Sequence, residues 1–243
     1  MYTEPEHPQV KPPTFIAPER GEVLAGLAYL ILHMFFIGPA IRLFAGLFDL
    51  PLSMLTLNLL YFLIGSFVLA LAMRRYLIAS FIRFRVYGIR NLKAFLMGCV
   101  IRYGSAIPLA MIIVLLLPDF STTPNNEAVV AMAYDHLLPT AFLAIVLAPI
   151  LEELLFRGAL YGGLRNKNRI AAYLVSSLLF AFLHVVSFLL LIPTSTLLLM
   201  MLLYIPAGIG LAYAYEKSGS IWTAIFLHAG MNFVAIALNT TLF

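Results

Sequence analysis

Residues 137–162 read LLPTAFLAIVLAPILEELLFRGALYG, an apolar stretch that contains two adjacent glutamates, Glu152 and Glu153, followed by Arg157. A helix needs about 20 mainly apolar residues to cross the hydrocarbon core of a membrane. A charge at the centre of such a helix costs at least ~2.5–3.5 kcal/mol, so ionisable residues there are candidates for function. The stretch therefore predicts a membrane helix that carries part of a functional site.

The rest of the chain has the composition of a membrane protein. Hydrophobic residues make up 63% of the 243 residues and charged residues only 11%, whereas a soluble domain has roughly 45–50% apolar and about 25% charged residues. Lipid must therefore surround much of the surface, and we predict an all-α polytopic transmembrane helix bundle. It has about seven spans, at 23–46, 54–73, 95–117, 137–162, 171–192, 196–215 and 220–240.

The distribution of lysine and arginine predicts the orientation. The connections at 74–93, 163–170 and 216–219 carry basic residues, whereas those at 47–53, 118–136 and 193–195 carry none. Basic loops favour the cytoplasmic side, so the N-terminus is predicted to be cytoplasmic and the C-terminus outside. This placement also accounts for the net charge of +4, and no nucleic-acid partner is expected.

Further polar residues interrupt the last spans. His184 lies four residues after Phe180, and His228 lies four residues before Asn232. Residues four apart share a helix face, so Phe180 is expected to pack beside His184, and His228 to project with Asn232. Counted from the cytoplasmic ends at 1.5 Å per residue, the depths of residues 152, 184 and 228 agree within about 8 Å.

The two adjacent glutamates are expected to have different roles. Glu153 can pair with Arg157 on its own helix, whereas Glu152 points about 100° away. Elsewhere in the spans, His33 is interpreted as a hydrogen-bonded bundle histidine, and Arg102 as a cation that snorkels or pairs with a carboxylate. The single cysteine, Cys99, is interpreted as a buried small hydrophobe.

Two hydrolytic schemes use the remaining residues. In one, Glu152 is the general base that activates water, His184 positions the water, and His228 and Asn232 stabilise the oxyanion. In the other, Glu152, His184 and His228 ligate a divalent metal such as zinc. Asn232 beside His228 suits an oxyanion site, so the metal-free scheme is slightly favoured. Interhelical hydrogen bonding without catalysis and a proton-coupled transporter are the alternatives.

Three motifs resemble one family. Glu152-Glu153-Leu-Leu-Phe-Arg157 resembles the EExxxR motif of the CAAX-protease and bacteriocin-processing (Abi, CPBP) family of intramembrane proteases. Phe180-Ala-Phe-Leu-His184 is similar to its FxxxH motif, and His228-Ala-Gly-Met-Asn232 to its HxxxN motif. The three occur in the family's order over residues 152–232.

The resemblance implies an intramembrane endopeptidase similar to the type II CAAX prenyl protease. Glu152, His184, His228 and Asn232 would be catalytic, and Glu153 and Arg157 would support them. The chain then divides into a flexible cytoplasmic tail at 1–22, variable spans at 23–136 with a basic cytoplasmic connection at 74–94, and a catalytic four-helix core at 137–243.

The resemblance also suggests partners and an alternative function. Membrane lipid and a protein or peptide substrate are expected, with the C-terminal tail of a prenylated protein as one candidate. A multi-pass protein of this kind would lie in the plasma (inner) membrane of a prokaryote. A non-catalytic membrane scaffold or a bacteriocin immunity factor is the alternative within the family.

Overall fold

The computed structural model describes residues 15–118 and 122–241, and these residues form helices and connecting turns without strands. The first part of the bundle contains the helices α1 (Arg20–Leu32), α2 (Gly38–Leu47), α3 (Met54–Ala72), α4 (Arg74–Val86), α5 (Gly88–Leu116) and α6 (Pro124–Asp135). The second part contains α7 (Leu137–Phe142), α8 (Ala148–Glu153), α9 (Gly162–Arg165), α10 (Arg169–Leu183), α11 (Thr194–Ser218) and α12 (Ile221–Thr241).

Several of these segments join into longer helices through π-helical turns. Segments α1 and α2 are continuous through η1 (His33–Ile37), and α7, α8 and α9 are continuous through η2 (Leu143–Leu147) and η3 (Leu154–Tyr161). Six of the resulting helices are long and apolar enough to cross a membrane. The predicted all-α polytopic bundle is therefore confirmed, and the protein is an integral, multi-pass membrane protein.

The seventh predicted span is shorter than expected. We predicted it at 171–192, but α10 ends at Leu183, and a short 3-10 turn (Val186–Phe188) follows. The His184 ring nitrogen Nδ1 bonds the Phe180 carbonyl at 2.8 Å. The His184 side chain thus satisfies one of the carbonyls left unpaired at the end of the helix. His184 therefore lies at the C-terminus of α10.

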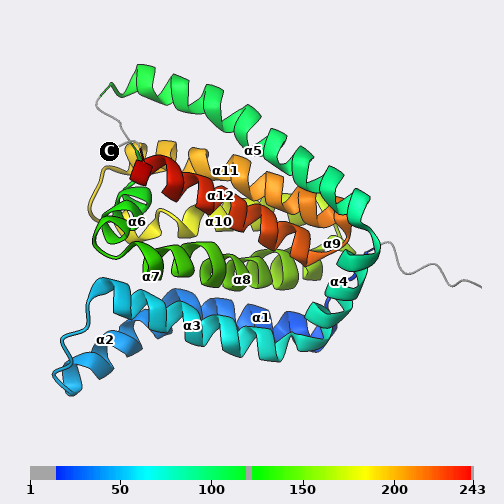
Figure 1. Ribbon diagram of the computed structural model, residues 1–243, viewed down its shortest axis with the longest axis horizontal. Helices are drawn as coiled ribbons and strands as arrows, with labels where there is room; N and C mark the ends of the chain where they lie inside the picture. The colour runs from blue at the N-terminus through cyan, green and yellow to red at the C-terminus, as the bar shows by residue number, and fades with distance from the viewer. Residues whose placement is uncertain (1–14, 119–121, 242–243) are drawn as a thin grey trace, which may run out of the picture.

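The basic connections lie together at one end of the bundle, on the right in Figure 1. There Arg83 of α4 donates to the Ser218 carbonyl at 3.1 Å, and Arg165 forms an ion pair with Glu216 at 2.6 Å. The backbone N–H of Ile16 bonds the Gly219 carbonyl at 3.1 Å at the same end. The C-terminus lies at the opposite end (Figure 1). This grouping agrees with the prediction, from the distribution of lysine and arginine, that these connections share the cytoplasmic side of the membrane.

The predicted flexible tail at 1–22 is wrong for its last residues. Residues 1–14 lie outside the described part of the chain. The Phe15 ring packs against Tyr215 with centroids 4.8 Å apart, and Glu22 is buried and accepts a bond from the Tyr76 backbone N–H at 2.9 Å. Apolar contacts and a capping carboxylate thus hold this segment against the bundle. The other domain boundaries stay predictions.

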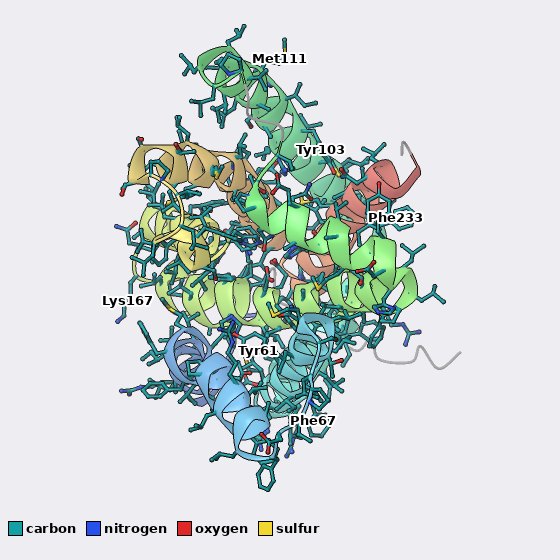
Figure 2. All side chains as sticks on the ribbon, turned by 90° about the vertical axis from the view of Figure 1, so that its left-hand side faces the viewer. Tyr61, Phe67, Tyr103, Met111, Lys167 and Phe233 are labelled. Atoms are coloured by element: carbon teal, nitrogen blue, oxygen red, sulfur yellow. The ribbon has the colours of Figure 1, made fainter. Side chains whose placement is uncertain are left out.

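The main hydrophobic core lies among α1, α3, η3, α10, α11 and α12. Helix α5 packs along α11, where a Cβ on Gly210 would lie 2.7 Å from the Gly98 carbonyl oxygen. The far half of α5 stands away from the other helices in both views, with Met111 near its tip (Figure 1 and Figure 2). Many apolar side chains of this half, such as Met111 and Leu115, are exposed.

Candidate active site

Glu152 and Glu153 end the α-helical segment α8, between the π-helical segments η2 and η3. A π-helical turn inserts a residue into the α-helical repeat and is frequent at functional sites. The two carboxylates point into different surroundings, as predicted. The side chain of Glu153 is completely buried, whereas that of Glu152 retains 15% exposure.

Glu153 is the centre of a buried ionic network. Its Oε1 accepts from Arg157 Nη1 at 2.9 Å and from His228 Nδ1 at 2.8 Å. Arg157 is also buried, donates through Nη2 to the Gly208 carbonyl at 2.9 Å, and lies over the Phe180 ring at 4.7 Å from its centroid. A buried charge is tolerated only when it is paired and hydrogen-bonded. The network therefore fixes His228 relative to the long helix that carries the glutamates.

Gly208 permits the contact with Arg157. A Cβ at this position would lie 2.8 Å from the Cα of Ser177, so only glycine allows α11 to approach α10 this closely. The Gly208 carbonyl can then reach the guanidinium. Sequence reasoning missed this residue, although a glycine within a span of small residues was a usable signal.

Two aromatic rings pack against His184. Phe180 packs against it with ring centroids 4.4 Å apart, as the spacing of four predicted. The centroid of the Tyr204 ring lies 4.5 Å from that of the His184 ring, and the Tyr204 hydroxyl forms a 2.6 Å hydrogen bond with Thr123. Tyr204 was not among the predicted residues, because a single tyrosine hydroxyl within an apolar span does not by itself indicate a functional site.

The two histidines face Glu152. The Glu152 Oε2 atom lies 3.8 Å from His228 Nε2 and 3.9 Å from His184 Nε2. Both Nδ1 atoms contact oxygen acceptors, the Glu153 carboxylate and the Phe180 carbonyl, so both carry the hydrogen. The Nε2 atoms therefore face the same small region as Glu152 Oε2, which is buried and has no hydrogen-bond partner.

The Glu152 carboxylate and the two imidazoles need a hydrogen-bond donor between them. Buried polar groups are normally hydrogen-bonded, and a separation of 3.8–3.9 Å is too long for a direct bond. A water molecule is the kind of group that bridges polar atoms over such distances. The geometry thus combines a carboxylate that can accept a proton with two imidazoles that can hold or return one.

Asn232 lies one turn beyond His228 on α12, and its Nδ2 donates to the Ala144 carbonyl in η2 at 2.7 Å. Both α12 side chains therefore contact the same long helix, His228 through Glu153 and Asn232 through Ala144. The amide nitrogen carries two hydrogens, so one remains for a substrate oxygen.

Two imidazoles and a carboxylate are also residue types that zinc accepts as ligands. Zinc ligands at 2.0–2.1 Å in tetrahedral geometry lie about 3.4 Å apart, which is shorter than the distances from Glu152 Oε2 to the two imidazoles. Among the described residues, no three His, Cys, Asp or Glu side chains form a group that could hold a metal ion. Glu152, His184 and His228 are brought together, with their facing atoms a few tenths of an ångström further apart than the ligands of a bound zinc ion.

The two other polar residues that the sequence singled out in the spans, His33 and Arg102, contact tyrosines of the bundle. His33 is hydrogen-bonded to the Tyr61 hydroxyl at 2.5 Å, which confirms its interpretation as a bundle histidine. Arg102 lines a cavity of about 370 Å³ with Tyr204, and its guanidinium lies 5.6 Å from the Tyr103 ring centroid. Within the described part of the chain no carboxylate pairs with it.

The stretch that contains all these motifs matches a known family model. Residues 134–234 match the type II CAAX prenyl endopeptidase Rce1-like family. The resemblance predicted from the three motifs is thereby confirmed over this stretch.

Two curated relatives agree with this match. The chain is 37% identical over 93 residues to "Putative membrane peptidase YdiL" of Bacillus subtilis (strain 168), and the alignment covers 37% of this chain and 34% of that protein. It is 29% identical over 126 residues to "UPF0177 protein YbdI" of Lactococcus lactis subsp. lactis (strain IL1403), and this alignment covers 51% of this chain and 62% of that protein. The alignments thus span less than two thirds of either relative. No solved structure matches the chain.

Proposed function

We propose that this protein is an intramembrane endopeptidase in which Glu152 activates a water molecule. The observation that carries the proposal is the buried, unpaired Oε2 of Glu152, which two imidazole Nε2 atoms face at 3.8 and 3.9 Å. The Rce1-like match of residues 134–234 and the similarity to a protein named as a membrane peptidase support the same class of reaction.

The first step is attack of water on the peptide carbonyl. Glu152 takes a proton from the water as the new C–O bond forms. Glu153 and Arg157 neutralise each other, so Glu152 is the remaining negative charge of the cluster. His184, whose ring is fixed by the Phe180 carbonyl and the Tyr204 ring, directs Nε2 towards the water.

The second step is collapse of the tetrahedral intermediate. The free N–H of Asn232 and His228 Nε2, when protonated, donate to the oxyanion. Glu153 stabilises a doubly protonated His228 by accepting from its Nδ1. Glu152 then returns its proton to the leaving amine as the C–N bond breaks, which restores the carboxylate.

The substrate in this proposal is a membrane-presented peptide that is cleaved near the cytoplasmic side. A C-terminal tail carrying a prenyl group is the candidate that the family match suggests. The apolar surroundings of the bundle suit a lipid group on the substrate, which would bring the tail to the level of the histidines.

The test is cleavage of a prenylated C-terminal peptide by the purified protein, followed by mass spectrometry. Replacing Glu152 by Gln should lower turnover by about 10²–10⁴-fold, the usual contribution of a general base. The matched control is Glu127→Gln on α6, a carboxylate outside this cluster, which should retain wild-type turnover. Wild-type turnover in Glu152→Gln would exclude Glu152 as the base.

A complete absence of cleavage by wild type, together with an intact biological effect of Glu152→Gln, would instead favour a scaffold or immunity factor. Substrate flux in proteoliposomes without proteolysis would favour a transporter.

The metal-free form of the proposal has its own experiment. Protein treated with a chelator, and checked for zinc by elemental analysis, should retain its turnover. Loss of activity on chelation with recovery on adding zinc would contradict the metal-free scheme.

A further inference from the structure

A large groove lies at the basic end of the bundle, away from Glu152. It has a volume of about 1050 Å³ and lies between the start of α5 and the last turns of α11. Arg90 and Lys93 of α5 and Lys217 of α11 line it, together with apolar residues of α5 that include Leu96 and Val100. The hydrolytic scheme uses none of these residues.

The three cations of this groove have no carboxylate partner in the described part of the chain. Elsewhere at the same end, Arg165 and Arg169 share Glu216, and Arg75 pairs with Glu19. Arg90 is held in place through its Nε, which donates to the Lys217 carbonyl at 2.5 Å. The groove therefore concentrates positive charge that the protein itself does not neutralise.

The lining changes from charged to apolar along α5. Positions 89, 93, 96, 97 and 100 follow one face of this helix, and residues 90 and 100 are about 15 Å apart along its axis. Val100 is 61% exposed. The charged end lies in the first two turns of α5, next to the basic connections, whereas Leu96 and Val100 lie further into this apolar helix. One end thus suits a headgroup and the other an acyl chain.

The start of α5 adds to the attraction for an anion. The helix begins at Gly88 without a side-chain cap, and Gly88 lines the groove. The positive end of the helix dipole and the unpaired N–H groups of its first turn favour a negative group at this position. Basic pockets between membrane helices on the cytoplasmic side are known sites for anionic lipid headgroups.

We propose that this groove binds one anionic phospholipid of the cytoplasmic leaflet. The phosphate lies among Arg90, Lys93 and Lys217, and one acyl chain follows α5 past Leu96 to Val100. The lipid thereby bridges α5 and α11 at the end of the bundle, without contacting the glutamate–histidine cluster.

The test uses the full-length protein in nanodiscs of phosphatidylcholine mixed with phosphatidylglycerol, with retained lipids counted by native mass spectrometry. Wild type should retain phosphatidylglycerol in preference to phosphatidylcholine. The triple variant Arg90→Gln, Lys93→Gln, Lys217→Gln should lose this preference, by about fivefold for each cation removed.

The matched control removes the same charge outside the groove. Arg20, Arg74 and Arg85 are exposed at the same end of the bundle but do not line it, so their triple glutamine variant should retain the lipid. Equal losses in the two triple variants would mean general surface attraction and would overturn the proposal. If the groove variant does not fold, the single variant Lys93→Gln takes its place.

The apolar half of the site is tested without changing charge. Val100→Trp fills the groove and should reduce retention of phosphatidylglycerol, whereas Val114→Trp, on an exposed part of the same helix, should not. Displacement of the lipid by inorganic phosphate would point to a simple anion site. Displacement by a soluble acidic peptide would point to a protein partner. Either result would contradict the proposal.

Discussion

The helices before residue 117 and those after residue 136 differ in what surrounds them. Within the most apolar stretch of each helix, 11% of α5 and 17% of the joined α1–α2 helix is buried. The corresponding share is 44% for the long helix at 137–165 and 50% for α11. The first set therefore faces mainly lipid, and the second faces mainly other helices.

This difference explains why the motifs gather in one half of the chain. Lipid accepts any apolar side chain of suitable length, so the outer helices require little beyond hydrophobicity. The inner helices must bury charged groups, and each buried charge needs a partner in a fixed place. Substitutions should therefore have large effects around Glu153 and small effects on the outer helices, and matched pairs of variants can test this.

The largest effect is expected at Arg157. Replacing it by Met leaves the Glu153 carboxylate buried without its ionic partner, which should cost about 3–5 kcal/mol of unfolding free energy. The matched control among the helices before residue 117 is Arg85→Met, an exposed residue of α4, which should change stability by no more than about 0.5 kcal/mol. Unfolding in mixed detergent micelles measures both.

A second variant separates charge from packing at this site. Adding Glu153→Gln to Arg157→Met removes the unpaired carboxylate and should recover part of the lost stability. If Arg157→Met and Arg85→Met proved equally stable, the contrast between the two regions would be wrong.

Asn232 should show the next largest effect, on turnover. Asn232→Ala removes a donor to the oxyanion, and such a loss costs about 10²–10³-fold in kcat. The matched control among the helices before residue 117 is Asn58→Ala on α3. The Asn58 amide donates to the Met132 sulfur at 3.9 Å, and the turnover of this variant should be unchanged. If Asn232→Ala destabilised the protein while its folded fraction kept wild-type kcat, Asn232 would be a structural residue that anchors α12 at Ala144.

A smaller effect on stability, steric in origin, is expected at Gly208, where two helices pack closely. Gly208→Ala places a Cβ 2.8 Å from the Cα of Ser177, and such overpacking costs about 1–3 kcal/mol. Gly104→Ala on α5 meets nothing within 4 Å and should be neutral or slightly stabilising, because alanine favours helix over glycine. Thermal unfolding monitored by circular dichroism separates the two. A neutral Gly208→Ala would show that α10 and α11 can move apart.

The sequence predicted much of this half of the protein because its signals were local. A charge inside an apolar run is visible without a structure, and spacing by four identified the Glu153–Arg157 and Phe180–His184 contacts. The grouping of basic loops at one end followed from the positions of lysine and arginine along the chain. These features depend on a single helix or a single loop at a time.

The features that the sequence did not predict depend on two or more helices together. The bond from His228 to Glu153 joins residues 75 positions apart, and the approach of Gly208 to Ser177 depends on how α10 and α11 cross. The early end of α10 arose from a side chain competing for a backbone carbonyl within a uniformly apolar stretch. Hydropathy does not reflect that competition, so the span at 171–192 was predicted too long.

The smallest effect is expected at Tyr204. Tyr204→Phe keeps the ring against His184 but removes the hydroxyl that bonds Thr123 at 2.6 Å, a net loss of about 1 kcal/mol. Because this bond fixes the ring beside a proposed catalytic group, kcat should fall several-fold while KM stays unchanged. Tyr61→Phe, which removes the comparable bond to His33, should lower stability by a similar amount and leave kcat intact. Equal kcat values in the two variants would mean that Tyr204 supports the bundle, as Tyr61 does, and does not position His184.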